Sequence, residues 1–112
     1  MNFFKGMRAI KTTISPQEVH RMMEETENFI LLDVRTPSEN KQARIEGAKL
    51  IPVDELANRA PSELPDKNVL ILVYCQSGMR AGNAVRILKR MGYANAYSFG
   101  GITSWPYDIV SG

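Results

Sequence analysis

The chain has 112 residues, of which 44% are hydrophobic and 23% are charged, and its formal net charge is +2. A chain of this length fits a single domain that can bury a core without a disulfide or metal, and so small a net charge gives no reason to expect nucleic-acid or anionic-membrane partners. Cys75 is the only cysteine, which excludes a disulfide within the chain and favours a cytoplasmic location.

Residues 1–11 are expected to form a short N-terminal extension ahead of a domain that covers residues 12–112. They contain Phe3 and Phe4 but no apolar run long enough for a signal peptide, and no later segment approaches a membrane span. We therefore expect a soluble protein with a frayed N-terminus, although the two phenylalanines could pack on the domain or on a second subunit.

The first predicted helix covers residues 16–24. Ser15 is a typical N-cap, Pro16 suits the first helical position, and Glu18 follows at the spacing of a capping box. Val19, Met22 and Met23 lie on one face of this helix at positions i, i+3 and i+4, so they should face the core.

Two apolar runs, 29–34, which is interrupted only at Asp33, and 69–74, are typical of strands that are covered on both faces. Between these runs we predict a turn leading into a short helix at 36–41, a strand at 48–51, a helix at 54–59, and a loop bracketed by Pro61 and Pro65. After them we predict a helix from Arg80 to about Gly92 and a strand at 96–99. This alternation predicts an α/β domain with a mostly parallel sheet of about five strands and helices on both faces.

Cys75 follows the most apolar predicted strand at its carboxyl end, where parallel α/β sheets bind ligands. The loop after it consists of Gln76, Ser77, Gly78 and Met79, and the next helix is expected to begin at Arg80. Amides of the loop and the first helical turn can converge on the sulfur and stabilise a thiolate, which is the nucleophilic form, and Gly78 would let the backbone approach it. The alternative is that Cys75 is a small buried hydrophobic residue, but the loop favours a chemically active thiol.

Four segments, in the same order along the chain, resemble motifs of the rhodanese family of sulfurtransferases. They are Leu32-Asp-Val-Arg35 with Glu39, Ile45-Glu-Gly-Ala48 with Ile51-Pro52, Tyr74-Cys-Gln-Ser-Gly-Met-Arg80, and Gly100-Gly-Ile-Thr-Ser-Trp105. The resemblance covers about residues 12–110 and implies a rhodanese-like α/β domain.

The resemblance also implies a ping-pong reaction. The Cys75 thiolate would take a sulfane sulfur from thiosulfate or a persulfide, hold it as a persulfide within the loop, and pass it to a thiol, cyanide or another thiophilic acceptor. Arg80 would close the loop and add positive potential, while Asp33 and Arg35 would fix its geometry from beside or beneath it. Alternatively, Asp33 and Arg35 form an ion pair with no influence on the chemistry.

Three positions depart from the family pattern. Arg44 stands where many members have histidine, and it could either attract an anionic donor or be a solvated surface residue. Gln76 replaces a residue that is often basic in members that use thiosulfate, and Met79 is apolar. The pocket should therefore hold less positive charge, which leaves a protein persulfide or a small organic persulfide as alternative donors.

The remaining candidates have structural interpretations. His20 has no neighbouring ligand, and one histidine with one cysteine gives no zinc-site spacing, so we predict neither a metal nor another cofactor. Trp105 and Tyr97 are expected to pack the C-terminal segment onto the domain, although Trp105 could also form part of the pocket rim.

Two other functions compete with sulfur transfer. Cysteine phosphatases and arsenate reductases have five residues between cysteine and arginine, whereas four separate Cys75 from Arg80, and this shorter loop suits a sulfur atom better than a tetrahedral phosphate. A non-catalytic binding module or a partner-dependent sulfur relay would retain the same residues. Monomer and weak dimer are both open.

Overall fold

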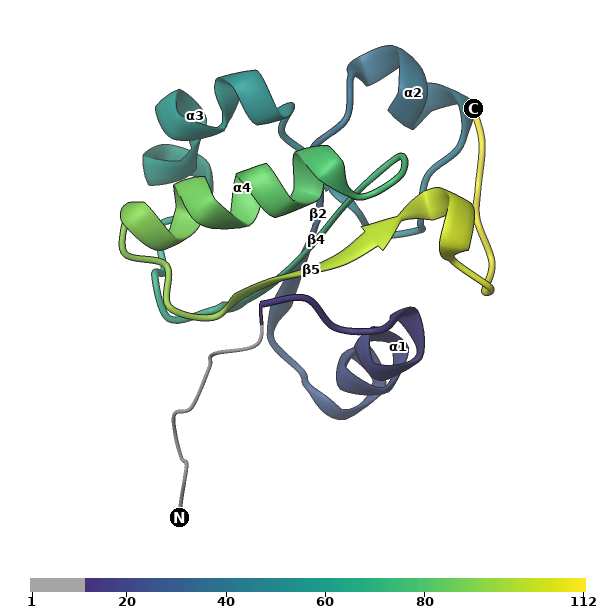
Figure 1. The fold of residues 1–112 in the computed structure, drawn as a ribbon, viewed down its shortest axis with the longest axis horizontal. Coiled ribbons are helices and arrows are strands. Elements are labelled where there is room, and N and C mark those ends of the chain that lie inside the picture. Colours follow the sequence, from purple (N-terminus) through teal and green to yellow (C-terminus); the bar gives the residue numbers. More distant parts are fainter. Residues whose placement is uncertain (1–11) are drawn as a thin grey trace.

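The computed structural model describes residues 12–112, which form four parallel strands with helices on both faces of the sheet (Figure 1). The elements are α1 (Pro16–Glu25), β2 (Phe29–Asp33), α2 (Pro37–Gln42), β3 (Lys49–Leu50), the 3₁₀ turn η1 (Val53–Glu55), α3 (Leu56–Glu63), β4 (Leu70–Cys75), α4 (Met79–Arg90), β5 (Ala96–Gly101) and the 3₁₀ turn η2 (Ile102–Ser104). The strand order is β3-β2-β4-β5, with β4 in the centre of the sheet beside β2. The predicted α/β architecture is confirmed.

A fifth position in the sheet is occupied by a single parallel bridge next to β5. Thr13 pairs with Ser98, the Ile14 amide donates to the Ser98 carbonyl at 2.9 Å, and the Ser98 amide donates to the Thr12 carbonyl at 2.8 Å. The sheet of about five strands is thus four strands and one bridge. The N-terminal extension expected at residues 1–11 lies outside the described residues.

Side chains that cap the helices explain where α1 and α2 begin. Ser15 Oγ accepts from the Glu18 amide at 3.1 Å. Thr36 and Glu39 form a reciprocal capping box, because the Glu39 amide donates to Thr36 Oγ1 and the Thr36 amide donates to Glu39 Oε1. This second cap fixes the Glu39 carboxylate at the start of α2.

The alternating side chains of β4 divide the core into two clusters. Ile71, Val73 and Cys75 pack against the helices on one face, and Leu72 and Tyr74 pack on the other face. Figure 1 shows α3 and α4 on the first side of the sheet and α1 on the second. Burying each large apolar side chain contributes about 1.5–3 kcal/mol, so both faces hold β4 and the residue at its end in place.

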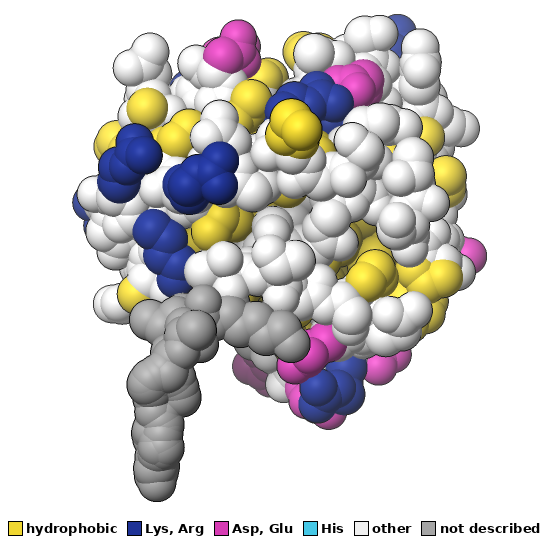
Figure 2. Space-filling model, in the orientation of Figure 1, with side chains coloured by type: hydrophobic (Ala, Val, Ile, Leu, Met, Phe, Trp, Pro, Cys, Tyr) yellow, Lys and Arg dark blue, Asp and Glu magenta, His cyan; other side chains and the backbone are white. Residues whose placement is uncertain are grey.

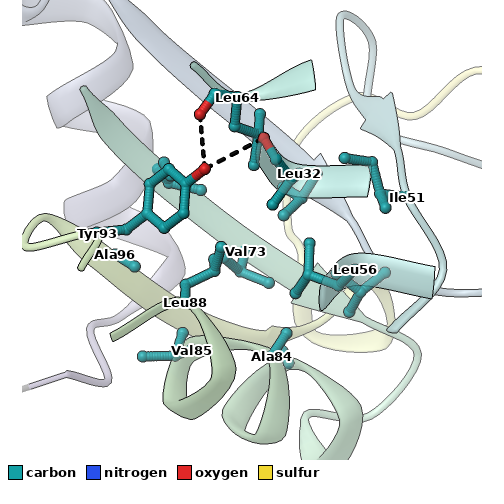
Figure 3. Packing of buried hydrophobic residues seen from close by; sticks show 14 of the residues in the cluster. Leu32, Ile51, Leu56, Leu64, Val73, Ala84, Val85, Leu88, Tyr93 and Ala96 are labelled. Atoms are coloured by element: carbon teal, nitrogen blue, oxygen red, sulfur yellow. Dashed lines mark hydrogen bonds between the residues drawn. The ribbon is translucent and has the colours of Figure 1, made fainter. Parts of the chain in front are cut away.

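The loop predicted between Pro61 and Pro65 is wrong at its start, because α3 continues through Pro61 to Glu63. A proline here removes one hydrogen bond near the helix end, while Ala60 and Leu64 remain fully buried. The Tyr93 hydroxyl donates to the Leu64 carbonyl at 2.7 Å and lies 3.1 Å from the Ala60 carbonyl (Figure 3). Packing and this tyrosine outweigh the local effect of proline.

No helix within residues 12–112 has the length and apolar character needed to cross a bilayer.

Candidate active site

Cys75 is the last residue of β4 and is only 1% exposed. The pairing of β4 with β5 is irregular at this point: Val73 pairs with Ser98, but Cys75 pairs with Gly101, so β5 contributes one extra residue. The strand end and the bulge of β5 therefore enclose the sulfur on the sheet side.

Two backbone amides donate to the Cys75 sulfur. The Gly78 amide lies 3.0 Å and the Ala81 amide 3.3 Å from Sγ, and we call this pair of donors the sulfur cradle. Gly78 is the N-cap of α4 and has φ of +118°, which a residue with a side chain rarely adopts. The cradle directs N–H groups and the positive end of α4 toward Sγ, an arrangement that stabilises negative charge on sulfur.

The loop is also fixed from the side of β5. A Cβ atom at Gly101 would stand 2.0 Å from the Gln76 carbonyl oxygen, so only glycine allows this approach. The same oxygen accepts from the Thr103 amide at 3.3 Å and from Thr103 Oγ1 at 3.1 Å. Sequence reasoning missed the role of Thr103; the paired glycines that precede it were the available signal.

Asp33 and Arg35 form a buried ion pair next to the loop. Arg35 Nη2 lies 2.8 Å and Nε 3.0 Å from the two Asp33 oxygens, and the residues are 2% and 0% exposed. Arg35 Nη1 donates to Gln76 Oε1 at 3.1 Å and Nη2 donates to the Ala43 carbonyl at 2.6 Å. Asn40, which sequence reasoning missed, donates to Asp33 Oδ2 at 3.0 Å.

This ion pair positions the loop without leaving a free cation there. Burial alone would lower the pKa of Arg35, but its hydrogen bonds and charge interaction with Asp33 outweigh burial and raise that pKa above its ordinary value. Arg35 thus stays charged and its charge is balanced by Asp33.

Arg80 connects the end of the loop to α2. Its Nη1 and Nη2 atoms lie 2.8 and 2.9 Å from the two Glu39 oxygens, in a bidentate pair. The bonds from Arg80, together with those from Thr36, lower the pKa of Glu39 to about 2 against the opposing effect of burial. The positive potential expected from Arg80 is therefore offset by Glu39.

The loop presents its remaining side chains to solvent. Ser77 is exposed, and Met79, at 86%, is the most exposed large hydrophobic side chain of the described residues. Beside the loop lies a cavity of about 270 Å³ lined in part by Arg35, Gln76 and Thr103. The loop and this cavity are therefore open to a molecule that approaches from solvent.

The other residues considered in the sequence lie elsewhere or serve in packing. The Arg44 guanidinium donates to the Asn40 and Gly112 carbonyls at 3.4 and 3.3 Å. His20 stacks on Tyr107 with ring centroids 3.9 Å apart, and Trp105 packs against Phe99. No cluster of His, Cys, Asp and Glu within residues 12–112 is arranged to hold a metal ion.

Comparison with known proteins places this geometry in a family. The Rhodanese-like domain model matches residues 15–107. The thiosulfate sulfurtransferase PspE of Escherichia coli is 39% identical over 81 residues, which are 72% of this chain and 78% of PspE. The structure of a rhodanese with anions from E. coli has 36% identity and a TM-score of 0.70, covering 74% of this chain and 98% of that one.

A second solved structure gives the same result from a more distant relative. The human single-domain sulfurtransferase TSTD1 is 26% identical with a TM-score of 0.75, and the match covers 84% of this chain and 94% of that one. Residues 15–107, which the family model matches, include the four strands, the loop and α4. The chain belongs to the rhodanese-like family of sulfurtransferases.

Proposed function

We propose that this protein is a sulfurtransferase enzyme that moves a sulfane sulfur from a donor to a thiophilic acceptor through a persulfide on Cys75. The sulfur cradle is the observation that carries the proposal. Two N–H donors on one buried sulfur stabilise an anion there, and hydrogen bonds to a charged group contribute about 1.5–3 kcal/mol each. A cysteine that served only in packing would not need them.

The reaction has two balanced half-steps. The Cys75 thiolate attacks the outer sulfur of thiosulfate, a Cys75 S–S bond forms, the donor S–S bond breaks, and its electron pair leaves with sulfite. In the second half-step an acceptor such as cyanide or a thiolate attacks the terminal sulfur of the persulfide. The electron pair then returns to Cys75, which restores the thiolate.

The surrounding residues have different roles in this proposal. Gln76 to Arg80 form the loop that holds the persulfide, with Gly78 supplying an amide and Arg80 holding the loop against α2. Asp33 and Arg35 are positioning residues, because they reach the loop through Gln76. Residues 12–112 would form the catalytic domain and would need no cofactor. A cytoplasmic location and a monomeric or weakly dimeric state remain predictions.

Intact mass spectrometry tests this function directly. The reduced protein, incubated with thiosulfate, should gain the mass of one sulfur atom and lose it again when cyanide is added. The Cys75→Ser variant, which keeps the fold and lacks the thiol, should gain nothing. If neither thiosulfate nor a low-molecular-weight persulfide adds sulfur to the reduced protein, the persulfide mechanism is wrong.

A partner-dependent sulfur relay is a second candidate, and one observation favours it. Arg35 and Arg80, the cations closest to the loop, are each bonded to a carboxylate. A small dianion such as thiosulfate therefore gains little attraction at the loop itself. In a relay, transfer from a protein persulfide would be fast and turnover of thiosulfate slow.

A further inference from the structure

Charge is distributed unevenly along the chain around the active site. No Asp or Glu occurs between Asp66 and Asp108, although this span includes β4, the loop, α4 and β5. The same span contains five cations, which are Lys67, Arg80, Arg86, Lys89 and Arg90. In contrast, α1 and the turn after it carry four of the glutamates, at positions 18, 24, 25 and 27.

The exposed side chains of α4 form one continuous row that starts at the loop. Met79, Asn83, Arg86 and Arg90 are all exposed and follow each other at intervals of four, three and four residues, which puts them on one face of the helix. We call this row the α4 stripe. It runs for roughly 16 Å along the helix at 1.5 Å per residue, and its first residue directly follows the Gly78 amide of the sulfur cradle.

The two arginines of the α4 stripe are not neutralised by the protein itself. Within residues 12–112 neither Arg86 nor Arg90 forms an ion pair, whereas Arg35, Arg59 and Arg80 all do. Residues 1–11 contain no Asp or Glu that could supply a partner. The only side-chain bond that Arg86 makes there is to Asn83, at 3.3 Å, within the same stripe.

A hollow next to the stripe increases the positive character of this face. It has a volume of about 320 Å³ and is lined by Arg86, Lys89 and Arg90 together with the Thr12, Thr13 and Ser98 segment of the sheet edge. Figure 2 shows Lys and Arg side chains gathered over the region of α4, while Asp and Glu side chains lie where α1 is. Acidic side chains of a partner would find uncompensated cations here.

We propose that the α4 stripe is the docking surface for an acidic protein that delivers sulfur to Cys75 as a cysteine persulfide. The inference rests on the proposed sulfur transfer and names the class of donor. Acidic residues of the partner would bind Arg86 and Arg90, and its persulfide would lie at the Met79 end of the stripe. Met79, unbranched and exposed, would supply an adaptable apolar contact beside the reacting sulfurs.

The transfer step is balanced without a further reactant. The Cys75 thiolate attacks the terminal sulfur of the partner's persulfide, and an S–S bond forms to Cys75 Sγ. The S–S bond of the partner breaks, and its electron pair leaves with the partner's cysteine thiolate. The terminal proton of the persulfide stays on the transferred sulfur.

The charge pattern favours a protein donor over a small one. The cations nearest the thiol, Arg35 and Arg80, form ion pairs with carboxylates of the protein, so a small anion gains little electrostatic attraction there. The uncompensated cations lie further along α4, within reach of a partner that covers the helix. Such a field raises association rates by about 10–10³-fold, and the effect falls with ionic strength.

Three persulfide donors separate this proposal from simpler explanations. The first is a helical peptide with several glutamates and one cysteine persulfide at its end, and the second is the same peptide with lysines for the glutamates. The third is the persulfide of N-acetylcysteine methyl ester, called the uncharged donor because it has no charged group besides the persulfide that all three share. Initial rates of sulfur addition to Cys75 are measured by quenched intact-mass analysis at low and high salt. Sulfur should add from the acidic peptide about tenfold faster than from the basic one at low salt, in the range expected for steering by charge.

Variants then locate the effect on α4. The double variant Arg86→Glu with Arg90→Glu should slow the acidic peptide by about tenfold or more and leave the uncharged donor within about twofold. The single variant Arg86→Glu should slow the acidic peptide in the same direction, and Arg21→Glu on α1 is its matched control. Arg21 is also an exposed helical arginine, with 59% of its side chain exposed, but it pairs with Glu18 and Glu25, and its reversal should have little effect. If the double reversal fails to fold, Arg86→Gln with Arg90→Gln tests the same contacts with a smaller expected effect.

The outcomes distinguish docking from chemistry. Equal rates for the acidic and basic peptides, or equal effects of the α4 and α1 variants, would overturn the docking surface while the uncharged donor still showed that Cys75 accepts sulfur. Failure of all three donors to add sulfur would overturn the proposed function together with the docking surface.

Discussion

At Gln76 the backbone and the side chain connect the loop to different parts of the protein. The carbonyl oxygen is held by Thr103 beyond β5, and the side-chain oxygen accepts from Arg35 on the opposite side. The residue therefore fixes the loop between two structural elements, yet it brings no charge to the thiol. This arrangement supports the proposal that a well-ordered site here attracts a dianion only weakly.

Replacing Gln76 by arginine should raise turnover of thiosulfate more than that of an uncharged persulfide. The new cation stands near the thiolate, and Arg35 keeps its bonds to Asp33 and to the Ala43 carbonyl. One added charge about 8 Å from a dianion in water contributes about 1 kcal/mol, which corresponds to about a fivefold gain in kcat/KM. The measurement compares kcat/KM for both donors, with Gln76→Leu as a control that removes the hydrogen bond without adding charge. Equal changes for the two donors would contradict the prediction.

Among single residues, sequence reasoning found those whose role is local. Cys75 and Gly78 were recognisable because a cysteine at a strand end and a glycine in a short loop have consequences within a few residues. The partners of Arg35 and Arg80 were not all recognisable in this way. Arg80 and Glu39 are 41 positions apart, so only folding shows that the expected positive potential of Arg80 is balanced.

At the scale of elements, α2 is a short helix that supports the loop. Its capping box orients Glu39, and Glu39 in turn holds Arg80 at the start of α4. Two helices on different parts of the chain are thereby joined at the mouth of the site. Stability and loop geometry should both depend on this ion pair.

Removing the charge of Glu39 should therefore destabilise the protein in a pH-dependent way. The pKa of Glu39 is about 2 in the folded protein and 4.5 ordinarily, so its contribution is present above about pH 4.5 and is lost as pH falls toward 2. Because the pair is partly exposed, we expect Glu39→Gln to lower the free energy of unfolding by at most about 1 kcal/mol at pH 7. Chemical denaturation between pH 7 and pH 3 should show wild type and variant converging.

The control for this measurement is Glu63, whose pKa is also about 2 because of its bonds with Arg59 and Lys49. Glu63→Gln should show the same direction of pH dependence on α3, away from the loop. A difference between wild type and Glu39→Gln that stayed constant down to pH 3 would show that the charge of Glu39 is not the cause.

Elements were predictable from sequence where their ends depend on neighbouring residues. Ser15 marks the start of α1 because capping is a local hydrogen bond, and the structure agrees. Thr36 caps α2 by the same kind of bond, within the segment predicted as a short helix. Pro61 was misleading, since burial of Ala60 and Leu64 and the Tyr93 hydroxyl keep α3 helical through it. The close approach of Gly101 to Gln76 likewise depends on a bulge between two strands and has no local signature.

At the scale of the whole molecule, the presence of a single cysteine limits how the outer sulfur of a Cys75 persulfide could be released. The chain has no second thiol to attack a persulfide on Cys75. In the proposed cycle, release of sulfur therefore needs an acceptor from another molecule, such as a thiol, and recovery from oxidation to a sulfenic acid needs an external thiol. This requirement matches a protein that passes sulfur between partners.

The persulfide on Cys75 should persist in the absence of thiols and disappear quickly when glutathione is added. Intact mass recorded over time gives both rates, and we expect at least about a tenfold difference because a thiolate must attack the persulfide directly. S-methylglutathione, which has similar size and charge but no thiol, is the matched control and should have no effect. Equal decay rates with and without glutathione would count against an external acceptor.

The sulfur cradle consists of main-chain atoms, and this determines which side chains of the loop can be substituted without removing a bond to the sulfur. The two donors to Sγ are main-chain amides, and no other side chain within residues 12–112 bonds to the sulfur, although the approach of β5 to the loop requires glycine at Gly101. Ser77 and Met79, by contrast, project into solvent and contribute no bond to the sulfur. Under the proposed sulfur transfer, substitutions at these outward positions would change donor preference and leave the amides that hold Sγ in place, so selectivity and reactivity would be separable traits of this scaffold.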